Sequence, residues 1–229
     1  MSLLLLAAAS LPFNNATGGT ETTVSNYNGT GETWKVHSFT STGTLSVTKA
    51  SQAFAVLVVG AGASGTENGG NGAQVQENLS TTIASGDTAV TVGVGTDSAG
   101  SAGGNSSLGA ILTANGGSGT GSGNTGGDFP IYNGGSGDGG ANTTANSTGA
   151  SGQTSSVSGT STGYGGGGGG GALNNTPGNG TDGGGNGGNS VRGQNGAANR
   201  GGGGGGGQFV TPRHGIGGSG VVVVAYQIG

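Results

Sequence analysis

The sequence predicts an all-β protein with an inserted bundle of polyglycine II-type helices and long loops rich in glycine, asparagine and serine. Three observations support this prediction. Apolar runs of strand length, Ala53–Val59 and Gly220–Ile228, lie on either side of the most glycine-rich region. Two uninterrupted glycine runs, Gly165–Gly171 and Gly201–Gly207, lie between them. No stretch of useful length has the period of an α-helix.

The glycine runs have two interpretations. A flexible linker is the usual meaning of such composition, because glycine has no side chain to bury and loses much backbone entropy on ordering. Extended threefold helices are the alternative, in which NH and CO groups point outward and bond to neighbouring helices. A Cβ would hold such helices apart, which explains runs of pure glycine. We favour the helices, because the final apolar strand must return to the domain that precedes the runs.

Composition narrows the class of protein. The 229 residues include 62 glycines, 6% charged residues and no cysteine, with a net charge of −4. A small apolar core combined with a backbone-bonded glycine lattice fits this composition. Without cysteine there is no disulfide framework, thiol nucleophile or cysteine metal site. The stretch between Ala50 and Val191 has no lysine or arginine, so the basic stripe needed for nucleic-acid binding is missing.

The first 31 residues are expected to form an apolar peptide and an extended arm that attach the protein to a partner. The apolar peptide contains Leu3, Leu4, Leu5 and Leu6, which are expected to dock on another protein. A secretory signal is the alternative, but the stretch lacks a basic beginning. It is also too short to span a membrane. Residues 11–31 are polar and rich in turn formers, which predicts an arm.

Residues 32–229 are expected to form a glycine-rich β domain, with the polyglycine insertion at about 115–218. Alternation predicts a first strand over Trp34–Phe39, and Gly43 separates it from the next. The continuous apolar run Ala53–Val59 predicts a central strand buried on both faces. The β-branched run Gly220–Ile228 predicts another buried strand. Further elements are a strand at Thr44–Thr48, a strand at Thr88–Val94 and a short hairpin at Ser107–Thr113.

Motifs for catalysis or cofactors are weak. Gly60–Gly65 has the spacing GxGxxG after a strand, but Thr66–Gly72 is too rich in glycine to open the helix that a dinucleotide site requires. The histidines, His37 and His214, have no acidic neighbour beside them in sequence. Asp138 lies among glycines but outside any array of calcium-binding repeats, which favours a turn aspartate. We therefore expect no enzyme, no cofactor and no metal.

Bulky residues interrupt the glycine in three places, and these are the candidate binding residues. If the helices form a stiff bundle, the interruptions are its end loops, where recognition commonly occurs. Aromatic and arginine side chains are favoured anchors of interfaces. The alternative is that the bulky residues merely cap the lattice. The candidates are Phe129, Pro130, Ile131, Tyr132, Leu173, Asn174, Asn175, Pro177, Phe209, Pro212, Arg213 and His214.

Several blocks resemble a known family. They are Trp34–Thr44, Phe54–Gly62, Gly104–Gly109 and Gly217–Tyr226. In this order they resemble the glycine-rich domain family that is common in tail-fibre and other virion proteins of bacteriophages. The centre, with Gly70–Val75, is also similar to the glycine-rich region of some receptor tyrosine kinases, which implies a jelly-roll-like sandwich with polyglycine helices. A looser likeness is to phage adhesins whose loops between such helices bind the host.

The resemblance implies a bacteriophage virion structural protein, a tail-fibre or spike component that presents loops to the host surface. Its expected location is the virion. Its expected partners are other virion proteins through the arm, a host-surface protein or glycan, and further copies of itself, for example in a trimer. One alternative is a purely structural capsid decoration or head-fibre protein. A second alternative is a secreted bacterial glycine-rich surface protein.

Overall fold

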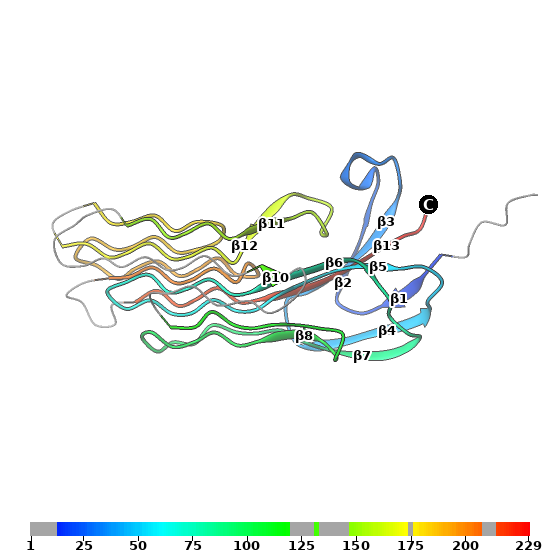
Figure 1. Cartoon of the computed structure of the whole chain (residues 1–229), viewed down its shortest axis with the longest axis horizontal. Helices are drawn as coiled ribbons and strands as arrows, with labels where there is room; N and C mark the ends of the chain where they lie inside the picture. The colour runs from blue at the N-terminus through cyan, green and yellow to red at the C-terminus, as the bar shows by residue number, and fades with distance from the viewer. Residues whose placement is uncertain (1–12, 120–130, 133–146, 174–175, 208–213) are drawn as a thin grey trace, which may run out of the picture.

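A computed structural model describes residues 13–119, 131–132, 147–173, 176–207 and 214–229. Within these residues the chain is all-β, and its one helical element is the short 3-10 turn η1 (Tyr27–Gly29). The β-strands gather at one end of the molecule, and glycine-rich segments run side by side from them to the other end (Figure 1). The predicted all-β class is confirmed.

The larger sheet has six antiparallel strands, and the last strand of the chain lies inside it. In β13 (Val221–Gln227), Val222 pairs with Val58 on one side and with Phe39 on the other. This confirms the prediction that the final apolar run is a buried strand. The order is β10 (Ile131–Tyr132), β6 (Val75–Thr81), β5 (Phe54–Val59), β13, β3 (Trp34–Phe39) and β2 (Thr20–Val24).

The other sheets are smaller and also antiparallel. The five-stranded sheet has the order β1 (Asn15–Thr17), β4 (Gly43–Lys49), β7 (Gly86–Thr91), β8 (Ser106–Leu108) and β9 (Leu112–Ala114). The third sheet is the pair β11 (Gln153–Ser155) and β12 (Thr162–Tyr164). The hairpin predicted at residues 107–113 is therefore confirmed as β8 and β9. The strand predicted over Thr88–Val94 ends earlier, at Thr91, where the chain enters a glycine-rich segment.

Two apolar clusters cover the two faces of the six-stranded sheet. Val56 and Val58 of β5 belong to the cluster between the two large sheets, which pack as a β-sandwich. Leu57 and Val59 belong to the cluster on the opposite face, together with Tyr164 of β12. Every residue of β5 is buried as a result, which confirms the prediction from its continuous apolar sequence.

The segment predicted as an arm contributes two strands to the sandwich. Ala16 of β1 pairs with Val47, and Val24 of β2 pairs with Trp34. The residues of β2 have the sequence Thr-Glu-Thr-Thr-Val, and the first four are exposed at the edge of the sheet. An edge strand with this composition lacks the alternation of apolar residues by which a strand is normally recognised.

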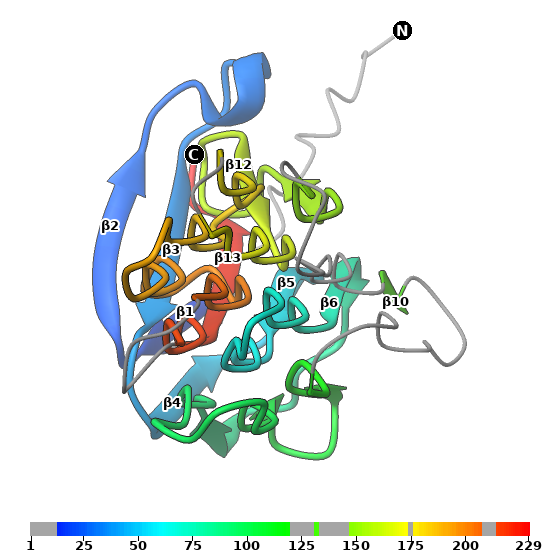
Figure 2. The same ribbon diagram turned by 90° about the vertical axis from the view of Figure 1, so that its left-hand side faces the viewer.

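The glycine-rich segments form a layer that we call the glycine layer: residues 60–74, 93–105, 114–119, 147–152, 165–172, 176–207 and 214–220. The backbone amides and carbonyls of neighbouring segments bond to one another. Along one segment, every third residue bonds to the same neighbouring segment. The amides of Gly203 and Gly206 donate to the carbonyls of Gly166 and Gly169, at 2.9 Å each. Viewed from the end, the segments are compact coils beside one another (Figure 2).

The same run bonds to other neighbours with the same period. The amides of Gly204 and Gly207 donate to the carbonyls of Ala63 and Thr66, at 2.9 Å each. The carbonyl groups of Gly202 to Gly206 accept in turn from the amides of Gly218, Gly185, Gly70, Gly215 and Gly188. The run Gly201–Gly207 is therefore surrounded by backbone partners, and all of its residues are buried.

Close approach explains why the central positions are glycine. A Cβ on Gly203 would lie closer than 3.0 Å to the carbonyl oxygen of Gly70, and one on Gly204 would meet that of Gly215. The layer also extends beyond the insertion predicted at about 115–218. Residues 60–74 belong to it, since Gly62 donates to the carbonyl of Gly218 at 2.9 Å.

Candidate recognition site at the far end of the glycine layer

The direction of the segments defines a far end of the glycine layer, away from the strands. Gly165–Gly171 follows β12 directly, so Leu173 lies where this segment reaches the far end. Residues 214–220 lead directly into β13. The amides of Gly215 and Gly218 donate to the carbonyls of Gly205 and Gly202, at 2.8 Å each. This antiparallel pairing brings residues 207 and 214 to the same far end.

Three charged or titratable side chains meet at this end. The Nη2 atom of Arg192 lies 3.7 Å from Oδ1 of Asp97, and Nε2 of His214 lies 3.4 Å from the same oxygen. The Nε atom of Arg192 also donates a hydrogen bond to the carbonyl of His214 at 2.7 Å. Arg192 thus connects the turn at Asp97 to the residue at which the last segment begins.

The His214 ring is buried, although Asp97 is exposed. Only 7% of the His214 surface is accessible. Among the described residues, its Nε2 atom has no partner with hydrogen-bond geometry. Its contact with Asp97 is therefore an ion pair only when the ring is protonated. The sequence did not indicate this cluster, because its members are far apart in the chain and belong to different segments.

The predicted site residues divide into three groups. Leu173, 39% exposed, and His214 lie at the far end, while Pro177 is half-buried near the start of the next described segment. Ile131 and Tyr132 form β10, where they pair with Gln76 and Val75 at the edge of the six-stranded sheet. The remaining candidates lie outside the described residues: Leu3, Leu4, Leu5, Leu6, Phe129, Pro130, Asn174, Asn175, Phe209, Pro212 and Arg213.

The free edge of the six-stranded sheet explains why Ile131 and Tyr132 form the strand β10. Isoleucine and tyrosine both favour strands, and the edge of β6 offers unpaired backbone groups to them. A strand at this position lies beside residues that begin β6, whereas an end loop would lie beyond the glycine segments. The structure therefore separates Ile131 and Tyr132 from Leu173 and His214.

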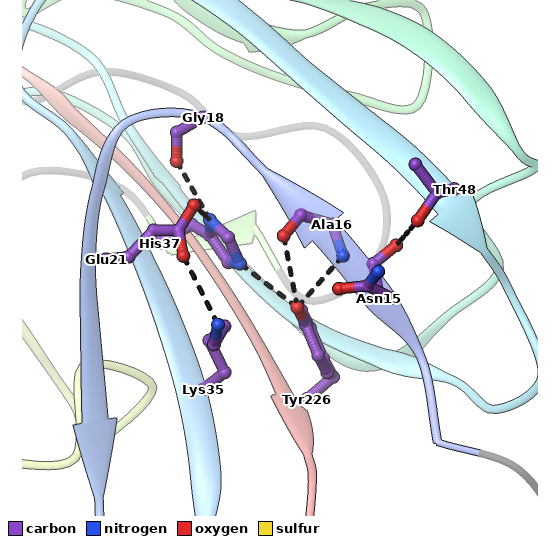
Figure 3. Close-up of polar contacts among 8 residues, drawn as sticks. All are labelled: Asn15, Ala16, Gly18, Glu21, Lys35, His37, Thr48 and Tyr226. Atoms are coloured by element: carbon purple, nitrogen blue, oxygen red, sulfur yellow. Dashed lines mark hydrogen bonds and ion pairs between the residues drawn. The ribbon is translucent and has the colours of Figure 1, made fainter.

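The other histidine, His37, belongs to a buried polar network between strands of the sandwich (Figure 3). Its Nδ1 atom lies 2.8 Å from the carbonyl of Gly18, and its Nε2 atom lies 3.3 Å from the hydroxyl of Tyr226. Glu21 lies 3.9 Å from Nδ1 and bonds to Lys35 at 3.3 Å. The acidic neighbour that the local sequence lacked is supplied by β2.

The network provides partners for both ring nitrogens of His37, while burial itself keeps the ring neutral. Burial lowers the pKa of His37 below its ordinary value, although the Gly18 carbonyl and the Glu21 carboxylate partly oppose this effect. Burial also raises the pKa of the Tyr226 hydroxyl. Both rings are therefore uncharged near neutral pH and act as hydrogen-bonding partners, which suits a structural connection between β1, β3 and β13.

The GxGxxG segment is part of the glycine layer. The amides of Gly62 and Gly65 donate to the carbonyls of Gly218 and Gly215, so both already have backbone partners. No helix occurs in residues 66–119, the described stretch that follows this segment. Among the described residues, no group of three or more His, Cys, Asp or Glu side chains could hold a metal ion.

Comparison with known sequences identifies the family of the chain. A family model described as a glycine-rich domain matches residues 38–227. The chain belongs to the glycine-rich domain family. The match runs from β3 to the end of β13, so it includes most of the sandwich and the whole glycine layer. No curated protein matches the chain. Within the part that the structure describes, no helix has the length and apolar character needed to cross a membrane.

Proposed function

We propose that this glycine-rich domain protein is a structural protein of a bacteriophage virion, a tail-fibre or spike component that presents the far end of the glycine layer to the host surface. In this proposal the sandwich is jelly-roll-like and the glycine segments are polyglycine II helices. The N-terminal apolar peptide, with Leu3, Leu4, Leu5 and Leu6, binds other virion proteins. The partner at the far end is a host-surface protein or glycan, and several copies assemble together.

One observation carries the proposal: the backbone lattice around Gly201–Gly207. Its hydrogen bonds recur at every third residue, as expected for threefold helices with about three residues per turn. Such a lattice is stiff because every neighbour is bonded, and it has no room for side chains at its centre. Larger side chains, among them Leu173 and Arg192, occur where segments end. A rigid scaffold that exposes side chains at one end suits recognition.

The location of the protein tests the structural part of the proposal. A tagged copy should give density in the tail fibres or at the tail tip in a cryo-EM map of the intact particle. Density on the capsid shell would assign the protein to decoration instead. Secretion by a bacterium, with no copy in any particle, would contradict the virion assignment.

Adsorption tests the recognition part. The double variant Leu173→Ala and Phe209→Ala removes two bulky candidates, Leu173 being exposed at the far end, so adsorption to the host should fall by roughly ten-fold or more. Ile111→Ala is a matched control, because Ile111 is a partly exposed apolar residue in the β8–β9 turn of the sandwich. Particles of both kinds should contain normal amounts of the protein. Unchanged adsorption of the double variant would contradict host recognition by these residues.

A further inference from the structure

The outer face of the six-stranded sheet carries a cleft that is separate from the far end. We call it the flank cleft; it is lined by Tyr27, Asn28, Trp34, Ala55, Glu77, Leu79 and residues 154–157, and has a volume of about 300 Å³. Two features border it. One is the η1 turn with Tyr27, and the other is the chain after β11, which contributes Val157 to the same apolar cluster.

Strand alternation explains which side chains reach the cleft. Glu77 and Leu79 of β6 lie two and four residues after Val75, so all three side chains point to the same face of the sheet. Val75 is buried in the apolar cluster on this face. Leu79 is exposed, which means that the cover over the sheet ends before it and leaves the cleft open.

Two aromatic rings form a fixed platform. The rings of Tyr27 and Trp34 are stacked, with centroids 4.4 Å apart and an interplanar angle of 11°. The Tyr27 hydroxyl donates to the carbonyl of Val157 at 2.9 Å, and Nε1 of Trp34 donates to Glu32 at 3.0 Å. These bonds use the polar atoms of both rings. The stack covers one face of each ring, and Tyr27 is only 5% exposed, so the aromatic surface that remains open to the cleft belongs mainly to the half-buried Trp34, which Tyr27 holds in place.

The rim of the cleft is polar and has unused hydrogen-bonding capacity. Within the part of the chain that the structure describes, the Glu77 carboxylate takes part in no hydrogen bond or ion pair. Asn28 donates from Nδ2 to the carbonyl of Ser156 at 3.3 Å, which leaves its Oδ1 as an acceptor. Thr154 and Ser156 add hydroxyl groups that can both donate and accept.

From this arrangement we infer that the flank cleft binds a pyranose sugar. A pyranose has an apolar face of C–H groups, which suits the aromatic platform, and an edge of hydroxyl groups, which suits the mixed rim. The C–H groups meet the negative face of an aromatic ring favourably. The carboxylate accepts from a sugar hydroxyl, and hydrogen bonds to an ionised group are the stronger kind. The cleft is at the lower end of the size range for small-molecule sites.

An organic ammonium ion is the other ligand that aromatic rings and a carboxylate can attract. The rim favours the sugar, because an ammonium group only donates and would leave the donor hydrogens of Thr154 and Ser156 unused. The sugar uses donors and acceptors together. The inference concerns a different surface from the far end and does not depend on the proposed virion role.

The chain has a built-in probe of this cleft, since Trp34 is its single tryptophan. Titration of the whole protein with the methyl glycosides of glucose, galactose, mannose and N-acetylglucosamine should change the Trp34 emission in a saturable way for at least one of them. Tetramethylammonium is titrated in parallel. Absence of a saturable change with all four glycosides would overturn the inference. A response to tetramethylammonium alone would also overturn it and assign the cleft to cations.

Two variants that keep Trp34 locate the response. Glu77→Gln should weaken sugar binding about ten-fold, because the bond to the ionised acceptor becomes a neutral one. Asp87→Asn removes the same charge from the five-stranded sheet, where Asp87 accepts from Ser46 at 2.6 Å, and should leave the affinity unchanged. Thermal melting confirms that both variants fold. Equal affinities of Glu77→Gln and the unchanged protein would show that the sugar binds elsewhere.

Discussion

The hydroxyl group of Tyr226 accepts a hydrogen bond from the backbone amide of Ala16 at 3.0 Å, across 210 positions of the sequence. The same hydroxyl lies 3.3 Å from Nε2 of His37, and the Tyr226 ring packs edge-on against Phe54 with centroids 5.4 Å apart. One side chain near the carboxyl end therefore connects the first described strand to the centre of the sandwich core.

Replacing Tyr226 by phenylalanine should destabilise the protein by about 1–3 kcal/mol, because the buried Ala16 amide loses its partner while the packing is kept. Urea unfolding measures this change in free energy. Tyr164→Phe is the matched control, since no hydrogen bond of its hydroxyl occurs in the described part of the chain. Its effect should stay below about 1 kcal/mol. Equal effects of the two variants would show that the Tyr226 hydroxyl has no special role.

The stability of the protein should decrease as the pH falls through the titration of His37. Burial lowers the pKa of folded His37 below the ordinary value of 6.5 that the unfolded chain retains. The unfolded state therefore binds the proton first. The contribution of His37 is complete above pH 6.5 and is lost as the pH falls from there through the folded pKa. Unfolding free energies between about pH 8 and pH 5 measure this slope.

His37→Gln removes the titrating group and retains a side chain that can hydrogen-bond to Gly18. The slope between neutral and mildly acidic pH should become shallower in this variant, whatever its absolute stability. A variant with the original slope would mean that another group dominates the pH dependence in this range.

Gly203→Ala should be strongly destabilising, by at least about 2 kcal/mol, because the new Cβ meets the backbone of Gly70 and neither backbone can move without breaking bonds to its neighbours. Gly43→Ala is the control. There a Cβ would be 3.6 Å from the Phe39 ring, an ordinary contact. Its melting temperature should stay close to that of the unchanged protein. A Gly203→Ala variant that melts like Gly43→Ala would contradict the close packing of the glycine layer.

Arg192→Gln should loosen the far end locally. The variant loses the charge that faces Asp97, and it cannot keep the geometry of the guanidinium bond to the His214 carbonyl. Hydrogen exchange should become faster at the amides of residues 214–216 and stay the same in β13. Arg200→Gln removes the same charge elsewhere and should leave the exchange of residues 214–216 unchanged. Protection that is equal in the two variants would show that Arg192 does not hold this end.

The sequence was sufficient to predict the strands whose apolar pattern results from burial. The runs that became β5 and β13 are continuously apolar because both faces of their sheet are covered. Strands β1 and β2 were not predicted, because edge pairing requires only backbone groups and β2 consists largely of threonine. The strands β11 and β12 were missed for a similar reason, since glycine, serine and threonine dominate that region.

The sites were harder to predict than the strands. The cluster of Asp97, Arg192 and His214 depends on how three glycine segments align, and no local pattern encodes that alignment. The flank cleft could have been found in part: Trp34 and Glu77 each lie on strands with an identifiable buried face. Their meeting required the order of the strands in the sheet, which the sequence did not supply.

The three-residue period of the hydrogen bonds has a consequence for how this protein can change in length. If three residues are added to a glycine segment, each following amide still points toward its original neighbouring segment. If one or two residues are added, each following amide points toward the wrong neighbour. In the proposed polyglycine II conformation, each addition of three residues would extend a segment by about 9 Å. Neighbouring segments must grow together to keep their bonds. Variation among related proteins should therefore move the far end outward or inward in coordinated steps while the sandwich stays the same.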